Sequence, residues 1–426
     1  MLLSGLCFFA LLGLTVVWFT YTHVQSSAEL LQYLDEQVLA AAAKAASAKA
    51  LGTPNVAAHV ASSSFSTTTT TTTIIDPALQ SHFVDCDALR QAFHSENGNN
   101  KYNVVDPNHG QEFIATINQS PAPEFVMSLH TQSFDGMRWM LKTTGRYYEK
   151  QLEASWSNVL RDAPPHARVL DVGGNIGYFS FFSAAHVTKS LHVDTFEPNP
   201  VNLLRACETR ALNQWKAEDL GRQTPPIAAA PTVNLWQWGI SDNIGSFHFE
   251  HNANPGAGKF TTNVRGASTN ATKLNVTTLD AFAAARGWLD VDSSSTTPPP
   301  RIEILKIDVE SHETCVLTGA KALLQRRIIR NIFMEWTVNR NKESFRNKQG
   351  KAMQILLDAG YTLCAWGGFL GPSPDKKLSF DATNHETFLD DFFEHHQRRK
   401  AGAINVWWQS DPTCPMGGPE PYQEKP

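Results

Sequence analysis

The stretch from Val169 to Ala185, VLDVGGNIGYFSFFSAA, constrains the fold of this chain more than any other. It begins with apolar residues and an acid, continues through a cluster of glycines, and ends in aromatic and small residues typical of a helix. This succession predicts a strand that enters a helix through a glycine-rich turn, the arrangement that binds the nucleotide part of a cofactor in open α/β sheets.

Strand and helix patterns alternate from about residue 167 onward. Helical patterns, such as residues 202–215 and 315–324, lie between several of the strand patterns. Such alternation predicts an α/β fold with a mostly parallel seven-stranded sheet and helices on both faces. Two further segments between the third and fourth strands predict an added hairpin, at residues 245–251 and 273–279. The strands of the main sheet are predicted at residues 167–173, 192–198, 233–240, 302–308, 329–336, 361–367 and 404–409.

The glycine cluster does not fit the G-x-G-x-x-G pattern of dinucleotide-binding turns. It carries Asp171-x-Gly173-x-Asn175-x-Gly177, which resembles the first motif of S-adenosylmethionine-dependent methyltransferases. A carboxylate near the turn suits a cofactor with an ammonium and a sulfonium better than one with a pyrophosphate. Glu197 follows the next strand, where a carboxylate accepts both ribose hydroxyls in such folds. We therefore expect S-adenosylmethionine as the cofactor.

The segment LKIDVESHE, residues 305–313, carries charged residues on a strand expected beside the first one. Alternation along a strand places Lys306, Asp308 and Glu310 on one face. A central parallel strand should be apolar on both faces, so charges at its carboxyl end indicate a site. The alternative is an ion-paired Lys306 with solvated acids where the strand leaves the sheet. Asp308, Glu310 and His312 are the candidate catalytic residues: Asp308 would also hold the ammonium of the cofactor, which leaves Glu310 or His312 as the base. A divalent cation held by the same carboxylates is the alternative, but without a second cluster we predict no metal.

These motifs together resemble the FkbM-type methyltransferase family over roughly residues 168–336. The likeness extends to Gly239-Ile-Ser-Asp242, and it departs at Gly174, where the family usually has alanine, and at Ser311, where it usually has glycine. The resemblance implies a Rossmann-like class I methyltransferase fold and O-methylation of a hydroxyl on a glycan, glycoconjugate or small molecule. It also implies a set of cofactor-binding residues: Asp171, Gly173, Gly174, Asn175, Gly177, Glu197, Asn199, Ser241, Asp242 and Asp308.

The N-terminal residues predict a membrane segment. No charged side chain precedes Glu29, and the apolar run from Leu2 to Tyr21 would span, as a helix, roughly the 30 Å of a bilayer core. We predict a transmembrane signal-anchor over residues 1–24, with a cleaved signal peptide as the alternative. The acidic flank that follows favours an amine-in orientation, so we expect a single-pass protein of a Golgi or other secretory-pathway membrane.

The remaining chain divides into four parts. Residues 25–80 form an Ala/Ser/Thr-rich stem, residues 81–150 an N-terminal extension of unassigned role, residues 151–412 the methyltransferase domain, and residues 413–426 a tail. In a luminal protein Asn270 is the best glycosylation candidate. A bridge between Cys364 and Cys414 is possible.

The charge balance disfavours a nucleic-acid partner, because 36 Lys and Arg face 41 Asp and Glu with no basic block. Two other functional classes stay open. An anchored, stem-bearing chain also fits a secretory-pathway glycosyltransferase, for which Asp85-x-Asp87 and Asp290-x-Asp292 are the candidate metal-binding pairs. The other class is a non-catalytic binding module that kept the fold and lost the activity.

Overall fold

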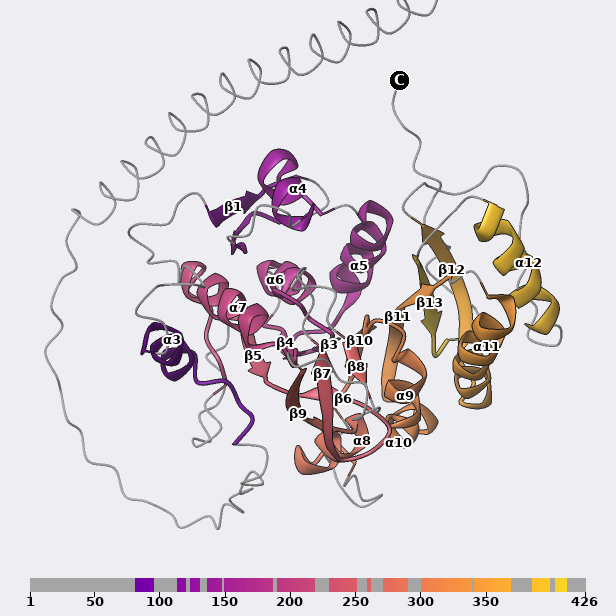
Figure 1. Cartoon of the computed structure of the whole chain (residues 1–426). Helices are drawn as coiled ribbons and strands as arrows, with labels where there is room; N and C mark the ends of the chain where they lie inside the picture. Colours follow the sequence, from indigo (N-terminus) through magenta and orange to yellow (C-terminus); the bar gives the residue numbers. More distant parts are fainter. Residues whose placement is uncertain are drawn as a thin grey trace, which may run out of the picture. The chain divides into compact units, whose positions relative to one another are not determined.

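A computed structural model gives the arrangement of most residues beyond position 80 (Figure 1). All of them belong to the second of two compact units, residues 72–426. The predicted anchor, stem and tail, and Asn270, lie outside the described residues. Among the residues that the structure describes, no helix is long and apolar enough to cross a membrane. The described residues are 81–95, 113–119, 123–130, 136–147, 149–186, 190–218, 230–250, 259–261, 271–289, 300–338, 341–368, 385–398 and 403–411.

A seven-stranded sheet lies at the centre of this unit, in the order β12-β13-β11-β10-β3-β4-β5. β11, β10, β3, β4 and β5 pair in parallel, and β13 runs antiparallel to β11 and β12. This topology confirms the predicted class I methyltransferase fold, and each predicted strand of the main sheet is present. Their bounds are β3 (Arg168–Val172), β4 (His192–Phe196), β5 (Thr232–Trp236), β10 (Ile302–Ile307), β11 (Ile329–Thr337), β12 (Thr362–Gly368) and β13 (Ala403–Gln409).

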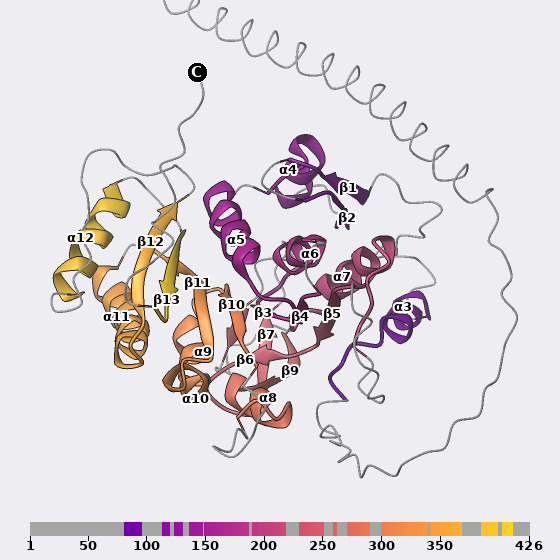
Figure 2. The same cartoon turned by 180° about the vertical axis from the view of Figure 1, so that it is seen from behind.

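Helices cover both faces of the sheet, as Figures 1 and 2 show. Side chains of β10 alternate between two hydrophobic cores: Ile304 packs in the core with α5 and α6, whereas Leu305 and Ile307 pack in the core with α9 and α11. On one face lie α5 (Lys150–Asp162), α6 (Tyr178–Ala185) and α7 (Pro200–Leu212), and on the other α8 (Leu279–Ala285), α9 (Glu313–Thr318), α10 (Lys321–Gln325), α11 (Lys342–Asp358) and α12 (His385–Arg398).

A second, four-stranded sheet has the order β6-β9-β7-β8. Its β7 (Gly245–Glu250) and β9 (Ala271–Thr277) pair antiparallel, which confirms the predicted hairpin. β6 (Gly239–Ile240) and β8 (Lys259–Thr261) complete it. The strand predicted at residues 233–240 is therefore two strands in different sheets. It breaks after Trp236 because the N–H of Gln237 donates to the carbonyl of His82.

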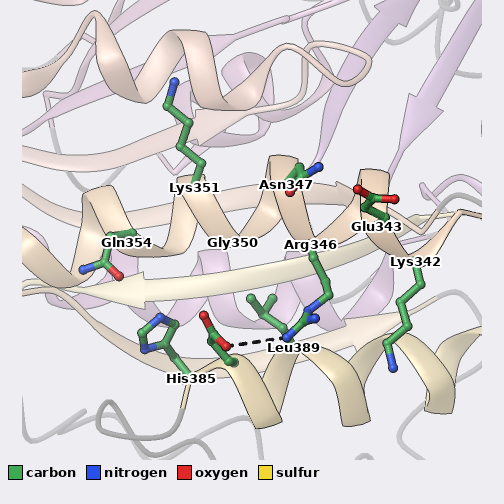
Figure 3. A pocket seen from close by; sticks show the side chains of 10 residues that line it. Lys342, Glu343, Arg346, Asn347, Gly350, Lys351, Gln354, His385 and Leu389 are labelled. Atoms are coloured by element: carbon green, nitrogen blue, oxygen red, sulfur yellow. Dashed lines mark ion pairs between the residues drawn. The ribbon is translucent and has the colours of Figure 1, made fainter.

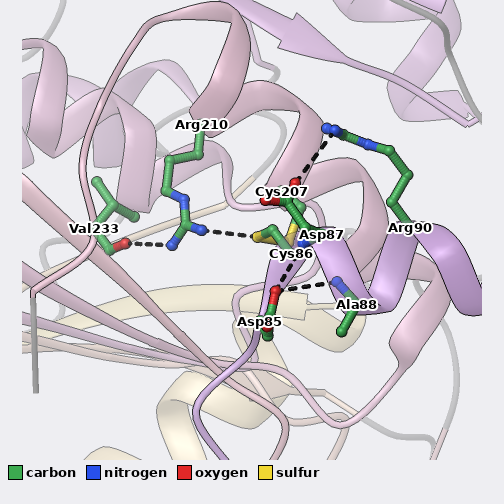
Figure 4. Close-up of a disulfide and its surroundings, with 8 residues drawn as sticks. All are labelled: Asp85, Cys86, Asp87, Ala88, Arg90, Cys207, Arg210 and Val233. Atoms are coloured by element: carbon green, nitrogen blue, oxygen red, sulfur yellow. Dashed lines mark hydrogen bonds and ion pairs between the residues drawn. A yellow bond between two sulfur atoms is a disulfide. The ribbon is translucent and has the colours of Figure 1, made fainter. Parts of the chain in front are cut away.

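The N-terminal extension adds α3 (Cys86–Ser95), β1 (Ile114–Ile117), β2 (Phe125–Ser128) and α4 (Gly136–Thr144) to this unit. A disulfide between Cys86 and Cys207 joins α3 to α7, with Cα atoms 5.5 Å apart (Figure 4). Cys364 is disulfide-bonded as well. Its predicted partner Cys414 lies outside the described residues, so that pairing stays a prediction.

Candidate active site

The glycine-rich turn packs tightly against the ends of β4 and β10. The N–H groups of Gly173 and Gly174 both donate to the carbonyl of Phe196. Gly173 has a φ of +79°, and a Cβ there would lie 1.8 Å from the carbonyl oxygen of Asp308. Only glycine meets both demands, because it lacks Cβ and adopts positive φ without strain. The turn therefore brings the cofactor motif and Asp308 together, as the sequence predicted.

Glu197 is held by the turns on either side of it. Its Oε2 accepts a hydrogen bond from the N–H of Asn175 at 2.8 Å, and its Oε1 accepts one from the N–H of Asn199 at 2.8 Å. Asn202, in the first turn of α7, donates its Nδ2 to the same Oε1 at 3.2 Å. Burial raises the pKa of Glu197 to about 7, although these hydrogen bonds oppose the rise. Three of the predicted cofactor residues thus meet in one arrangement.

A buried ion pair lies next to this arrangement. The Nζ of Lys306 is 3.1 Å from Oδ2 of Asp308 and 3.8 Å from Oδ1 of Asp171. Burial raises the pKa of Asp171, and Lys306 opposes that rise. The hydroxyl of Ser180 donates to Oδ2 of Asp171. The other oxygen of Asp171, Oδ1, is buried and receives no hydrogen bond from any described residue. Asp171 therefore lies beneath the glycine turn, and Asp308, the more exposed of the two carboxylates, is the one open to a ligand.

The strand register extends this polar patch across the sheet. Lys306 pairs with Phe333 of β11, so the next residue of β11 on that face, Glu335, lies beside Asp308. Glu335 in turn pairs with Asn405 of β13. Asn405 donates its Nδ2 to Oε1 of Glu149, the residue that precedes α5, at 2.6 Å. Carboxyl groups from three separate segments therefore gather at the carboxyl end of β10 and β11.

The crowding of these carboxyl groups shifts their pKa values. Burial, followed by the charge of Asp308, raises the pKa of Glu149 to about 7. Burial, followed by the charges of Asp308 and Glu149, raises the pKa of Glu335 to about 9. The pKa of Lys306 also lies above its usual value, because the three acids around it outweigh its burial. The cluster therefore holds a proton near neutral pH and can exchange it with a bound ligand.

The structure separates the three predicted catalytic residues. β10 ends at Ile307, so the strand alternation assumed for Glu310 does not apply: Glu310 has a φ of +53° and an exposed side chain. His312 precedes α9, and its Nε2 lies 3.0 Å from Oγ of Ser241. Of the three, only Asp308 forms an ion pair with Lys306, although the charges of Asp308 and Lys306 still act on Glu310.

Ser241 and Asp242 form a second group with His312. The N–H of Ser241 donates to the carbonyl of Thr277, which links the end of β6 to β9. Its hydroxyl donates to Oδ1 of Asp242 at 3.1 Å. Burial lowers the pKa of His312, whereas Asp242 opposes that change. The histidine is therefore hydrogen-bonded to Ser241, whose hydroxyl in turn donates to Asp242, so it contacts the predicted cofactor residues.

A hollow of about 720 Å³ lies elsewhere, between α11 and α12 (Figure 3). Lys342 and Arg346 line it and form ion pairs with Asp390 of α12. None of the predicted site residues lines this hollow. Within the described part of the chain, no three acidic, histidine or cysteine side chains are arranged to hold one metal ion.

The pair Asp85-x-Asp87, considered for a glycosyltransferase, serves the fold. Oδ1 of Asp85 accepts hydrogen bonds from the N–H groups of Asp87 and Ala88 in the first turn of α3, as Figure 4 shows. Such a carboxylate satisfies backbone donors at a helix start. The other pair, at positions 290 and 292, lies outside the described residues.

The strand order and the residues at the carboxyl ends define an S-adenosylmethionine-dependent methyltransferase fold. Residues 171–363 match the family model of the methyltransferase FkbM domain. Similar solved structures include the SAM-dependent methyltransferase from Agrobacterium tumefaciens, at 10% identity and a TM-score of 0.33, with 70% of each chain covered. Another is precorrin-6y C5,15-methyltransferase from Geobacter metallireducens, at 11% identity and a TM-score of 0.28, covering 61% of this chain and 88% of that one. No curated protein matches this chain.

S-adenosylmethionine is the cofactor of this domain, and the residues present fit it. No described residue donates a hydrogen bond to the buried Oδ1 of Asp171, which lies 3.8 Å from Nζ of Lys306, so acceptor capacity remains next to the glycine turn. Glu197 is oriented by backbone donors, and Asp308 presents a carboxylate for an ammonium. Gly174 serves packing, because a Cβ there would lie 2.3 Å from Cγ2 of Thr195. When bound, the cofactor supplies the methyl group.

Proposed function

We propose that the chain transfers a methyl group from S-adenosylmethionine to a hydroxyl of a glycan, glycoconjugate or small molecule. The observation that carries the proposal is the division of one sheet edge into two parts. Glu197 and the glycine turn lie at β3 and β4, and the carboxyl cluster of Glu149 and Glu335 lies at β10, β11 and β13. A hydroxyl is a poor nucleophile and gains from a base that removes its proton.

The residue roles follow from this division. Asp308 holds the ammonium of the cofactor, and a carboxylate of the neighbouring cluster takes the hydroxyl proton. The sequence left Glu310 or His312 as the base. The charges of Asp308 and Lys306 act on both Glu149 and Glu310, but Glu149 has the better position because it is less exposed and is oriented by Asn405. Ser241 and Asp242 extend the cofactor site toward β6.

Cofactor binding is the first expected outcome. We call the chain without its predicted anchor and stem the body. The purified body should bind S-adenosylmethionine and S-adenosylhomocysteine, and not NAD, in isothermal titration calorimetry. Glu197→Gln should weaken both by roughly tenfold or more, since it removes the negative charge that makes a hydrogen bond from the ribose charge-assisted and worth about 1.5–3 kcal/mol. Incubation with labelled cofactor and panels of glycans, lipids and small alcohols then identifies the acceptor. Binding of NAD alone would contradict the proposal.

We also propose that the body lies in the lumen of the secretory pathway, anchored by residues 1–24. The Cys86–Cys207 disulfide and the bonded state of Cys364 support an oxidising compartment, because disulfides are rare in the cytosol. On intact microsomes the body should resist protease until detergent is added, and endoglycosidase should remove a glycan from Asn270. Digestion without detergent would place the body in the cytosol instead.

A further inference from the structure

The N-terminal extension is bound along the length of α7, which follows the Glu197 turn. The N–H of Val126 donates to Oδ1 of Asn213 at 2.9 Å, and the N–H of Ser128 donates to Oγ1 of Thr209 at 2.9 Å. The hydroxyl of Ser128 donates to Oε2 of Glu208. Polar side chains of α7 and of Asn213, which follows it, thus accept hydrogen bonds from β2.

His130 contacts α7 about two turns nearer its start. Its Nε2 lies 2.9 Å from Oδ1 of Asn202, and its ring is buried at 4% exposure. Because Nδ2 of Asn202 donates to Glu197, Oδ1 of Asn202 is left to accept. His130 therefore carries a proton on Nε2 and donates it. Burial, followed by the charge of Arg205, lowers the pKa of His130 to about 4, so the ring is neutral at pH 7.

We propose that His130 is a positioning residue for the ribose of the cofactor: by fixing Asn202, it fixes the Glu197 carboxylate that accepts the ribose hydroxyls. The inference rests on the proposed role of Glu197. It gives the N-terminal extension a part in cofactor binding. The segment before the methyltransferase domain would then complete the cofactor site.

The test uses matched variants at one position. In His130→Gln, the amide nitrogen replaces Nε2 and still reaches Asn202, whereas in His130→Asn it falls at the place of Nδ1 and does not. We expect His130→Asn and His130→Leu to bind S-adenosylhomocysteine about three- to tenfold more weakly than the parent, because both variants lose the hydrogen bond that positions Asn202. His130→Gln should retain most of the affinity.

A ligand contrast separates positioning from general loosening of the fold. We expect His130→Asn to weaken adenosine but to leave 2′,3′-dideoxyadenosine, which lacks both ribose hydroxyls, unchanged in calorimetry. Ser128→Ala is the control, because it removes a hydrogen bond between β2 and α7 without touching Asn202. It should lower the melting temperature and leave both affinities at the parental value.

The outcomes are distinct. Equal affinity of His130→Asn and the parent for S-adenosylhomocysteine would overturn the inference, as would equal losses for adenosine and dideoxyadenosine. Failure of the parent itself to bind S-adenosylhomocysteine would overturn the proposed function and this inference with it. If His130→Leu does not fold, the comparison of His130→Gln with His130→Asn still decides.

Discussion

Lys306→Met is expected to destabilise the fold by about 3–5 kcal/mol at neutral pH, the usual cost of leaving one member of a buried ion pair unpaired. The side chain of Lys306 is 7% exposed and that of Asp171 is 1% exposed. Without the ammonium, Asp171 keeps only the hydrogen bonds from the hydroxyl and the backbone N–H of Ser180 to offset its burial. Urea unfolding of the purified body, followed by fluorescence, measures the change.

The loss should depend on pH in a defined direction. Removing Lys306 raises the pKa of folded Asp171 above its value in the folded parent, so the added cost is fully present only above the variant's raised pKa. The difference between parent and variant should therefore shrink as the pH falls through that raised pKa, and it should vanish below the pKa of Asp171 in the folded parent, which itself lies above its ordinary value. The double variant Asp171→Asn/Lys306→Met removes both charges and should recover much of the stability.

Lys342→Met is the matched surface control. Lys342 forms ion pairs with Asp390 at 3.4 Å and Glu394 at 3.3 Å, but its side chain is 38% exposed. Exposed pairs contribute about 0–1 kcal/mol, so this variant should unfold near the parental urea concentration. Equal unfolding midpoints for Lys306→Met and the parent would show that the buried pair contributes nothing.

Local patterns predicted the part of the site that depends on local geometry. The glycine turn could be predicted from the sequence because Gly173 and Gly177 stand where the backbone has positive φ, a conformation that few other residues adopt. Glu197 could be placed because it ends a parallel strand, and such ends converge on a ligand site. Lys306 and Asp308 were found because charges are unusual in a strand buried on both faces. Glu335 carries that same signal within the apolar run of β11, and it was missed.

The end of β10 was predicted wrongly for a physical reason. Alternation was extended to Glu310, but the backbone enters the left-handed region at Glu310 and at Ser311, where φ is +75°. Ser311 stands where the FkbM-type family usually has glycine, so the sequence carried a sign of this turn. A serine at positive φ is uncommon, and alternation alone cannot anticipate it.

Contacts between distant segments left no local pattern. Glu149 reaches Asn405 across 256 positions, and His130 reaches Asn202 across 72. Neither residue lies in a motif, and the extension that carries both was assigned no role. Such residues become visible only when the chain is folded, because their function depends on the strand order and on α7.

Glu149→Gln is expected to lower the rate of methyl transfer to the identified acceptor by roughly a hundredfold or more, the usual contribution of a general base. As the acceptor oxygen bonds to the methyl carbon, the bond from that carbon to sulfur breaks and the hydroxyl proton passes to the carboxylate. Asn405 occupies Oε1 of Glu149 and leaves Oε2 for that proton. Single-turnover measurements with labelled cofactor isolate this step.

The pH profile and the partner variants identify the base. With a pKa of about 7, Glu149 should give a rate that rises with pH up to about 7 and then levels off, and Glu149→Gln should remove that rise. Cofactor affinity should stay near the parental value, while Asp308→Asn should weaken both binding and turnover. Glu310→Gln, at the exposed position, should change the rate by less than about threefold if Glu149 is the base. A hundredfold loss in Glu310→Gln with a parental rate in Glu149→Gln would reverse the assignment and make Glu310 the base.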